Sequence, residues 1–330
     1  MDNVTHTLYG VALARTGLNR LAPRATATLI IGANFPDIDI ASFFGGSISY
    51  LKYHRGITHS LLGIPLEGLL VATVMYFIHN RRVKKDESAL WWKYFLLASA
   101  GVGSHVLLDF TNSYGLRLFL PFVRDWYSGD IEFIIDPWVL AVLFVALGLP
   151  SFFGLINQEI GIKNHEHRTS AFVCLIILLL YWGAKGLSHH QVLADLAQAE
   201  DLGEPIMRVG VVPQPLNPFR WYGIIETRSS YRVVERGWDP FDFSLGTQRD
   251  RIFHKAEEGP VLEAVRRGPQ ARMYLSFARY PVFTIIPRNQ GYTVTIQDLR
   301  FEPITSRRRA FLFMVELDKE LHTSSETFNF

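Results

Sequence analysis

The first half of the chain is organised around two polar stretches at the ends of apolar runs: His54-Arg55-Gly56-Ile57-Thr58-His59-Ser60 and His105-Val106-Leu107-Leu108-Asp109. In the second stretch, His105 and Asp109 are four residues apart, so on a helix they share one face. In the first, Gly56 lets the backbone turn between the two histidines. Imidazole and carboxylate groups that meet at the mouth of a helix bundle are typical metal ligands. The two stretches therefore predict a metal site held by helices.

The composition indicates a membrane protein. Of 330 residues, 48% are hydrophobic, and the mean hydropathy is positive, which is high for a soluble protein of this length. The net charge is only +2 and the basic residues form local clusters, so we expect no nucleic-acid partner. The single cysteine, Cys174, lies in an apolar run, which excludes a disulfide framework and a thiolate metal site. We expect no cleavable signal peptide, because no basic segment followed by an apolar one opens the chain.

Four apolar runs approach the length of about 20 residues that crosses a bilayer. They cover residues 61–79, 90–108, 133–153 and 171–187. Two shorter runs, Val4 to Leu13 and Ala25 to Ala33, predict short or re-entrant helices packed against other protein. Pro36 disfavours helix at the residue before it, so we expect Asp37 and Asp39 on a loop. The alternative for each run is a buried helix of a large soluble core.

Basic residues between the apolar runs predict the orientation in the membrane. They fall in alternate loops: Arg15, Arg20 and Arg24, then Arg81 to Lys85, then Lys163 and Arg168. The positive-inside rule places these loops in the cytoplasm. The opposite, extracytoplasmic face then receives every candidate ligand, together with Asp130 and Asp136. Because the charge argument made no use of the ligands, this agreement supports one shared site.

After Leu187 the character of the chain changes. Residues 188–203 indicate a polar, partly helical linker, and β-branched and aromatic runs bounded by Pro and Gly follow it. These runs predict strands over 206–212, 221–227, 231–234, 273–277, 282–286, 292–296 and 310–316, with a short helix over 261–267. We therefore expect an α-helical polytopic membrane domain over residues 1–190, with about four spans and two short re-entrant helices. A small β-rich extracytoplasmic domain is expected over residues 191–330.

The candidate metal ligands are His6, Asp37, Asp39, His54, His59, His105 and Asp109. They would hold one divalent ion, or two that share a carboxylate, with zinc the first expectation and manganese and iron left open. Either Asp39 or Asp136 would act as general base for a metal-activated water. Arg55 would bind an anionic group of the substrate through its planar fork. The alternatives for Arg55 are a lipid-headgroup contact and an ion pair with Asp37 or Asp39.

Each candidate also has an ordinary structural role open to it. Asp37 and Asp39 suit a turn, Thr58 suits an N-cap, and Asp109 suits the end of a helix. Glu67 would be a second-sphere partner or proton relay, or else a hydrogen-bonding group between packed helices. The joint pattern favours function, because ionisable groups at membrane depth are costly and usually functional.

A family resemblance rests on these same residues. The matching elements are Thr5-His6 with Gly10, Pro36-Asp37-Ile38-Asp39, the two polar stretches, Tyr114-Gly115 with Pro121, and Asp136-Pro137. Over about the first 150 residues the chain resembles the YdjM-type family of inner-membrane metal-dependent hydrolases. This resemblance implies a multi-pass protein of the bacterial inner membrane that hydrolyses its substrate with a metal-activated water.

A more distant likeness connects the chain to zinc-dependent phospholipase C and P1 nuclease. The order His6, Asp37/Asp39, His54/His59, His105/Asp109 is similar to the ligand order of that group, although its later His and Glu ligands have no evident equivalent here. The likeness implies hydrolysis of a phosphoester or related ester, with a lipid or lipid-linked substrate.

Two functions from other classes stay open on the sequence alone. The first is a non-catalytic membrane protein with a structural metal site and a β-rich domain that binds a protein partner, whose identity the sequence does not give. The second is an ion transporter, which would be expected to carry ligands near the bilayer midplane, where only Glu67 is well placed.

Overall fold

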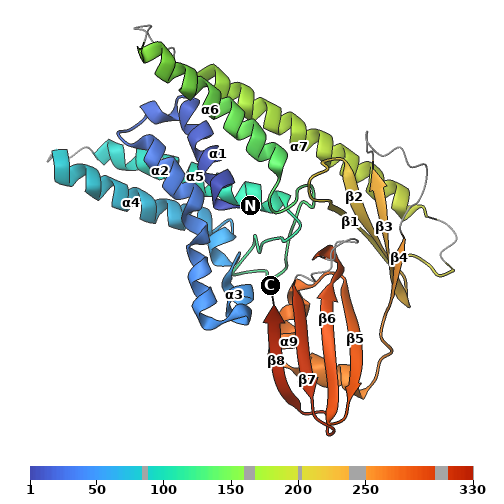
Figure 1. Ribbon diagram of the computed structural model, residues 1–330. Coiled ribbons are helices and arrows are strands. Elements are labelled where there is room, and N and C mark those ends of the chain that lie inside the picture. The colour runs from blue at the N-terminus through green and yellow to red at the C-terminus, as the bar shows by residue number, and fades with distance from the viewer. Residues whose placement is uncertain (84–87, 160–167, 200–202, 238–249, 302–310, 330) are drawn as a thin grey trace. The chain divides into compact units, whose positions relative to one another are not determined.

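The computed structural model describes residues 1–83, 88–159, 168–199, 203–237, 250–301 and 311–329, shown in Figure 1. The chain divides into two compact units. The first joins Met1–Asp39 to Arg55–Leu187, and the second joins Ile40–His54 to Ser188–Phe330. The domain limits expected from the sequence, 1–190 and 191–330, remain predictions. The sequence did not indicate that Ile40–His54 would group with the C-terminal part.

The N-terminal part of the chain is helical. In order it contains α1 (Asn3–Arg15), η1 (Leu18–Arg20), α2 (Ala25–Asn34), η2 (Phe35–Gly45), α3 (Ser47–Tyr53), η3 (Ile57–His59), α4 (Gly63–Val83), α5 (Ser88–Thr111), α6 (Pro137–Glu159) and α7 (Arg168–Ala197). The expected loop at Asp37 and Asp39 is 3₁₀-helical instead, although the α-helix does end just before Pro36, at Asn34. In the expected partly helical linker over residues 188–203, the helical part is the continuation of α7 through Ala197.

The helices pack through two apolar clusters in the first unit. One cluster contains Leu29 of α2, Met75 of α4 and Leu97 of α5. The other includes Ala12 of α1 and Leu143 of α6, together with residues of α5 and α7. α1 lies between these clusters and contributes to both. The N-terminal helix, too short to cross a membrane alone, is therefore held by protein on several sides.

Two glycines bring α2 and α5 into close backbone contact. A Cβ added at Gly32 would lie 2.6 Å from the carbonyl oxygen of Ala98, and one added at Gly101 would lie 2.6 Å from that of Leu29. Real Cβ atoms do not approach a carbonyl so closely, so only glycine fits at either position. This contact positions α5 beside the end of α2, where the candidate ligands begin.

Three helices in the described part of the chain are long and apolar enough to cross a membrane: Ala25–Gly45, Leu90–Thr111 and Arg168–Ala197. A fourth candidate span results if one bent pair of helices crosses the membrane together. This pair is Ser47–His59 and Gly63–Arg81, with an angle of 78° between them. The span expected over 133–153 is absent from this set, because α6 starts only after its cap Asp136 and its apolar part, Pro137–Phe153, is shorter. The second apolar run, expected to be a short or re-entrant helix, continues through η2 to Gly45 and is long and apolar enough to cross a membrane. Lys84, Lys85 and Lys163, which contribute to the predicted orientation, lie outside the described residues.

The second unit contains two four-stranded antiparallel sheets, ordered β1-β2-β3-β4 and β5-β6-β7-β8. Their elements are β1 (Arg208–Pro213), β2 (Arg220–Glu226), β3 (Ser230–Gly237), β4 (Arg251–His254), α8 (Pro260–Arg267), α9 (Pro269–Phe277), β5 (Pro281–Arg288), β6 (Gly291–Asp298), η4 (Leu299–Phe301), β7 (Leu312–Leu317) and β8 (Thr323–Asn329). Trp221 of the first sheet packs against Val192 and Leu196 at the end of α7. The β-rich character and the short helix over 261–267 are confirmed.

One expected strand is a helix. Residues 273–277 form the end of α9, which starts at Pro269 directly after Gly268. The side chains of Tyr274 and Phe277 are buried, and the Tyr274 ring stacks on Phe313 of β7 at 5.2 Å. The short apolar-aromatic run resembled a strand, but packing against the sheet favours the helix. The sequence also missed β4 and the Ser/Thr-rich β8, which lack an alternating apolar pattern. The expected strand over 310–316 corresponds to β7, except that Ala310 lies outside the described residues.

Candidate metal centre

Four of the candidate ligands converge in the first unit. Asp37 comes from η2, His59 from the end of η3, and His105 and Asp109 from one face of α5. Each offers a ligand atom, and these atoms lie within 4.8 Å of one another. The side chains of His59, His105 and Asp109 are fully buried, whereas Asp37 keeps 16% of its side chain exposed. The spacing of four residues on α5 places the side chains of His105 and Asp109 on one face of the helix, as the sequence predicted.

The distances within this cluster suit a metal ion. The two Nε2 atoms of His59 and His105 are 3.1 Å apart, and Oδ1 of Asp37 is 3.6 Å from each. Oδ2 of Asp109 lies 3.5 Å from Nε2 of His59 and 3.8 Å from Nε2 of His105. A tetrahedral ion with ligand bonds of about 2.1 Å separates its ligand atoms by about 3.4 Å. These five distances are therefore close to those expected for a tetrahedral site.

The tautomers of the two histidines give the sharpest indication of a cation. Nδ1 of His105 is 2.7 Å from the carbonyl oxygen of Ala33, which only accepts, so this nitrogen carries the proton. Nδ1 of His59 is 3.3 Å from the carboxylate Oδ2 of Asp39, which favours a proton there as well. Both Nε2 atoms then present lone pairs to each other at 3.1 Å. Two lone pairs repel at this distance unless a proton or a metal ion lies between them.

His6 adds a further imidazole to the cluster. Its ring stacks on that of His105, with 3.7 Å between the centroids, and its Nε2 is 3.4 Å from Oδ1 of Asp109. The side chain is fully buried, yet neither ring nitrogen forms a hydrogen bond within the described residues. Buried polar groups are nearly always satisfied. An ion bound beside Asp109 would satisfy this one.

Asp39 supports the cluster from behind His59. Besides its contact with the His59 ring, its Oδ2 accepts the Thr58 hydroxyl at 2.7 Å and the Arg55 backbone N–H at 2.9 Å. Arg55 has a φ of 54°, a left-handed conformation that costs free energy in a residue other than glycine. The hydrogen bond from its N–H helps to hold this conformation. Asp39 thus orients one ligand and fixes the turn between the two halves of the HRGITHS stretch.

Arg55 places a buried positive charge against the cluster. Its Nη2 is 2.9 Å from Oδ2 of Asp109, its Nη1 donates to Oδ1 of Asn112 at 2.9 Å, and the Tyr114 ring lies 4.7 Å from the guanidinium carbon. The amino group of Met1 also contacts Asp109. The ion pair foreseen with Asp37 or Asp39 is thus made with Asp109, and Asp39 receives the backbone of Arg55 instead. Binding of a substrate anion by Arg55 remains a prediction.

Two further sequence-predicted site residues, His54 and Asp136, are not part of this group of four. His54 belongs to the second unit, where its ring stacks on Tyr50 of α3 at 4.3 Å. Asp136 caps α6 and accepts from Lys185 Nζ at 3.0 Å and the Tyr181 hydroxyl at 2.9 Å. These contacts give Asp136 a structural role, and its action as a general base stays a prediction, as does ligation by His54.

Several buried polar residues near the helix ends were missed by the sequence argument. Glu132 is fully buried and accepts from the Trp182 indole at 2.8 Å, and burial raises the pKa of Glu132 to about 8. Arg117 is buried over the Trp126 ring, 4.9 Å from its centroid. Lys185 is buried beside Asp136. Only Lys185 carried a usable signal, as an isolated cation at the end of an otherwise aliphatic run.

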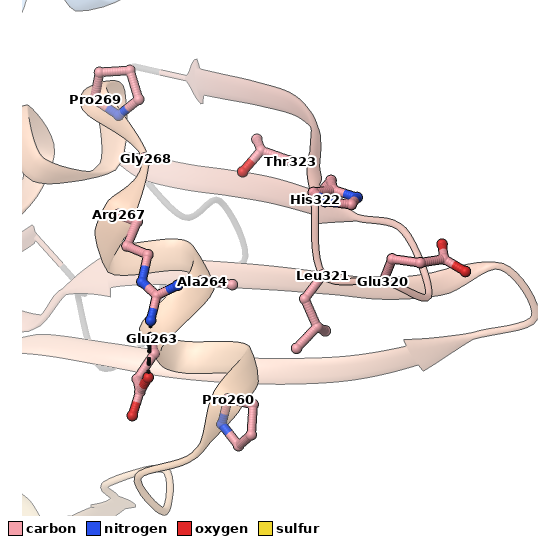
Figure 2. A pocket seen from close by; sticks show the side chains of 10 residues that line it. All are labelled: Pro260, Glu263, Ala264, Arg267, Gly268, Pro269, Glu320, Leu321, His322 and Thr323. Carbon is pink, nitrogen blue, oxygen red and sulfur yellow. Dashed lines mark hydrogen bonds and ion pairs between the residues drawn. The ribbon is translucent and has the colours of Figure 1, made fainter.

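The second unit has a pocket of its own. A cavity of about 520 Å³ lies between α8 and the turn that joins β7 to β8 (Figure 2). Glu263 and Arg267 on its helix wall form an ion pair at 3.3 Å, but their side chains are 63% and 81% exposed. Ion pairs at such exposure are solvated and contribute little. The pocket therefore supplies no buried group that resembles the cluster of the first unit.

The apolar helices and the buried histidine–aspartate cluster define a membrane protein with a candidate metal-binding centre. The family model described as YdjM inner membrane protein matches residues 1–192, and the chain belongs to this family. The chain is also similar to a protein of Bacillus subtilis (strain 168) described as uncharacterized protein YfhP. The two are 27% identical over 313 residues, which cover 91% of this chain and 87% of the relative. No solved structure matches the chain.

Proposed function

We propose that this YdjM-family protein is a membrane-bound metal-dependent hydrolase that cleaves a phosphoester, or a related ester, in a lipid or lipid-linked substrate. The observation that supports a bound metal is the short distance of 3.1 Å between the Nε2 atoms of His59 and His105, whose lone pairs face each other. The hydrolytic chemistry and the substrate class rest on the resemblance to metal-dependent hydrolases. Zinc is the first expectation, because imidazole and carboxylate ligands in a tetrahedral arrangement suit it.

The residues of the cluster have separate tasks in this proposal. Asp37, His59, His105 and Asp109 would supply the ligands of one ion, and His6 would bind beside Asp109, where a second ion would lie. When bound, the metal lowers the pKa of a coordinated water so that hydroxide is available near neutral pH. Of the ligands, only Asp37 is partly exposed, so the substrate approaches on its side.

Charge near the cluster favours an anionic substrate group. Arg55 is fixed by Asn112 and Asp109 with its guanidinium at the edge of the cluster, and a fixed guanidinium stabilises developing negative charge. Asp39, which already accepts three donors around His59, is the first candidate for the base that takes a proton from water. Asp136 is the second. A base must come within hydrogen-bonding reach of that water in a substrate complex.

The test compares metal content and turnover in the same preparations. The full chain in nanodiscs should contain stoichiometric zinc, manganese or iron by elemental analysis, and should hydrolyse phospholipid. His59→Ala and Asp109→Ala should lose both properties. His79→Ala, which removes a histidine near the end of α4 that lies outside the cluster, is the matched control and should keep them. Full activity in both cluster variants would end the catalytic proposal.

Complete burial of three ligands favours one alternative, a structural metal in a non-catalytic membrane protein. Structural sites are closed to substrate, whereas catalytic sites keep a position open. In this alternative, the β-rich domain would bind a protein partner. Removal of the metal would then lower the midpoint of thermal unfolding, and no ester would be hydrolysed by the metal-loaded protein.

We also propose the orientation of the protein in the inner membrane. The basic loops around Arg20, Arg81 and Arg168 would lie in the cytoplasm. The metal centre and the β-rich domain would lie on the extracytoplasmic side of a multi-pass membrane domain.

A further inference from the structure

A loop beside the metal centre exposes an unusual number of large apolar side chains. In the segment Leu118–Arg124, Phe119 is 43% exposed, Phe122 is 85% exposed and Val123 is 39% exposed. Exposed apolar surface is unfavourable in water by about 25 cal/mol per Å². A contiguous apolar patch of this kind usually marks a surface that contacts something other than water.

Backbone hydrogen bonds hold this loop in place beside the cluster. The N–H groups of Phe122 and Val123 both donate to the Phe119 carbonyl, at 2.9 and 3.1 Å. The Leu61 N–H donates to the Leu118 carbonyl at 2.9 Å, and the Arg117 N–H donates to the Arg55 carbonyl at 3.2 Å. The loop is thus attached to the segment that carries His59 and to the residue that contacts Asp109.

The apolar surface of the loop continues into that of a membrane helix. Across the Leu61–Leu118 hydrogen bond lie Ile57, Leu61 and Leu62, which are 46%, 50% and 40% exposed. These lead directly into α4, where Leu66, Leu69 and Leu70 are 53%, 50% and 50% exposed. Outward apolar side chains on a membrane helix face lipid, so the loop extends a lipid-facing surface. Arg124 is exposed next to Val123, and a basic side chain beside aromatic ones is typical of segments that lie at the headgroup level.

We propose that Leu118–Arg124, with Ile57, Leu61 and Leu62, forms a lipid-inserted rim of the metal centre. The occupant of this surface is bilayer lipid, with the side chains of Phe119 and Phe122 among the acyl chains and Arg124 at the phosphates. A lipid at the rim would present its headgroup to the side of the cluster that holds Arg55. Insertion of the rim does not depend on the hydrolase proposal, because it requires neither metal nor turnover.

Site-directed spin labels test the rim directly. Cys174 is the only cysteine, so Cys174→Ala provides a background for single labels. Phe122→Cys reports on the rim. Leu179→Cys, at a position 67% exposed on α7, is the lipid control, and Lys319→Cys, exposed in the second unit, is the aqueous control. The full chain is studied in nanodiscs of phosphatidylethanolamine and phosphatidylglycerol, with oxygen and a nickel chelate as relaxation agents.

The proposal expects the Phe122 label to behave like the Leu179 label, with high accessibility to oxygen and low accessibility to the chelate. Behaviour like that of the Lys319 label would place the loop in water and overturn the proposal. Shielding from both agents would mean that protein covers the loop, which also overturns it. Phe119→Cys is a second reporter that applies if Phe122→Cys does not fold. Since these readouts need no activity, a failure of the hydrolase proposal leaves them interpretable.

Discussion

At the residue scale, a backbone carbonyl determines how His105 can act. Ala33 accepts from Nδ1, so only Nε2 is available to a cation. Asp39 has the same effect on His59. Neither residue that fixes the tautomer needs to touch the ion, yet both determine whether the imidazole lone pairs point into the cluster. The candidate ligands His59 and His105 are therefore oriented by Asp39 and by the Ala33 carbonyl.

Asp39→Asn tests this support. The amide retains the size of the side chain but loses its charge and one acceptor oxygen, so His59 should lose its fixed orientation. We expect metal affinity to fall about 10–100-fold, as is usual for such outer partners. Competition with a fluorescent chelator measures it. Asp125→Asn, at an exposed position in the same unit, should leave affinity unchanged. Equal affinities in the two variants would contradict the role assigned to Asp39.

Glu132 supplies a prediction on pH. Burial raises the pKa of its carboxyl from 4.5 to about 8, so the folded state holds this proton more tightly than the unfolded chain. The stabilisation is complete below 4.5 and is lost as the pH rises through about 8. Glu132→Gln cannot ionise and should lose less stability over this range. Midpoints of thermal unfolding from pH 5 to pH 9 measure the difference between the two proteins. Parallel pH profiles would show that Glu132 does not titrate in this window.

At the scale of elements, the contact between α2 and α5 brings together two parts of the site. One is the end of α2, which leads to Asp37, and the other is His105 on α5. The contact places Ala33 against His105, and it requires glycine on both helices. The buried Asp136–Lys185 pair does comparable work, because it ties the start of α6 to α7.

Gly32→Ala tests the close contact of α2 and α5. The new Cβ would meet the carbonyl of Ala98, so the helices must separate, at a cost of about 1–3 kcal/mol in the free energy of unfolding. Metal affinity should fall with it, because His105 moves away from Ala33. Gly148→Ala on α6 is the matched control, since nothing lies within 4 Å of an added Cβ there. This variant should be neutral or more stable by up to about 1 kcal/mol. Denaturant titration and chelator competition measure the two effects, and equal behaviour of the variants would contradict the account.

At the scale of the whole molecule, the orientation of the membrane helices decides where the metal centre works. A phosphatase reporter, active only outside the cytoplasm, should be inactive when fused after Arg82 and active when fused after Phe330. A fluorescent protein that folds only in the cytoplasm should give the opposite pattern at the two positions. The proposed arrangement needs an odd number of membrane crossings between Arg82 and Phe330. A cytoplasmic C-terminus would need an even number, so it would overturn this arrangement.

The sequence by itself determined the membrane class, the β-rich C-terminal part and the shared helix face of His105 and Asp109 on α5. Hydropathy, strand periodicity and a spacing of four residues on a helix are local properties, so they can be read without coordinates. Only the tertiary structure decided that Arg55 pairs with Asp109, that residues 273–277 are helical, and that the Nε2 atoms of His59 and His105 face each other. Each of these depends on a neighbour far away along the chain, such as Ala33 for His105 or Phe313 for Tyr274. Packing selects among local alternatives that the residues alone leave equally open.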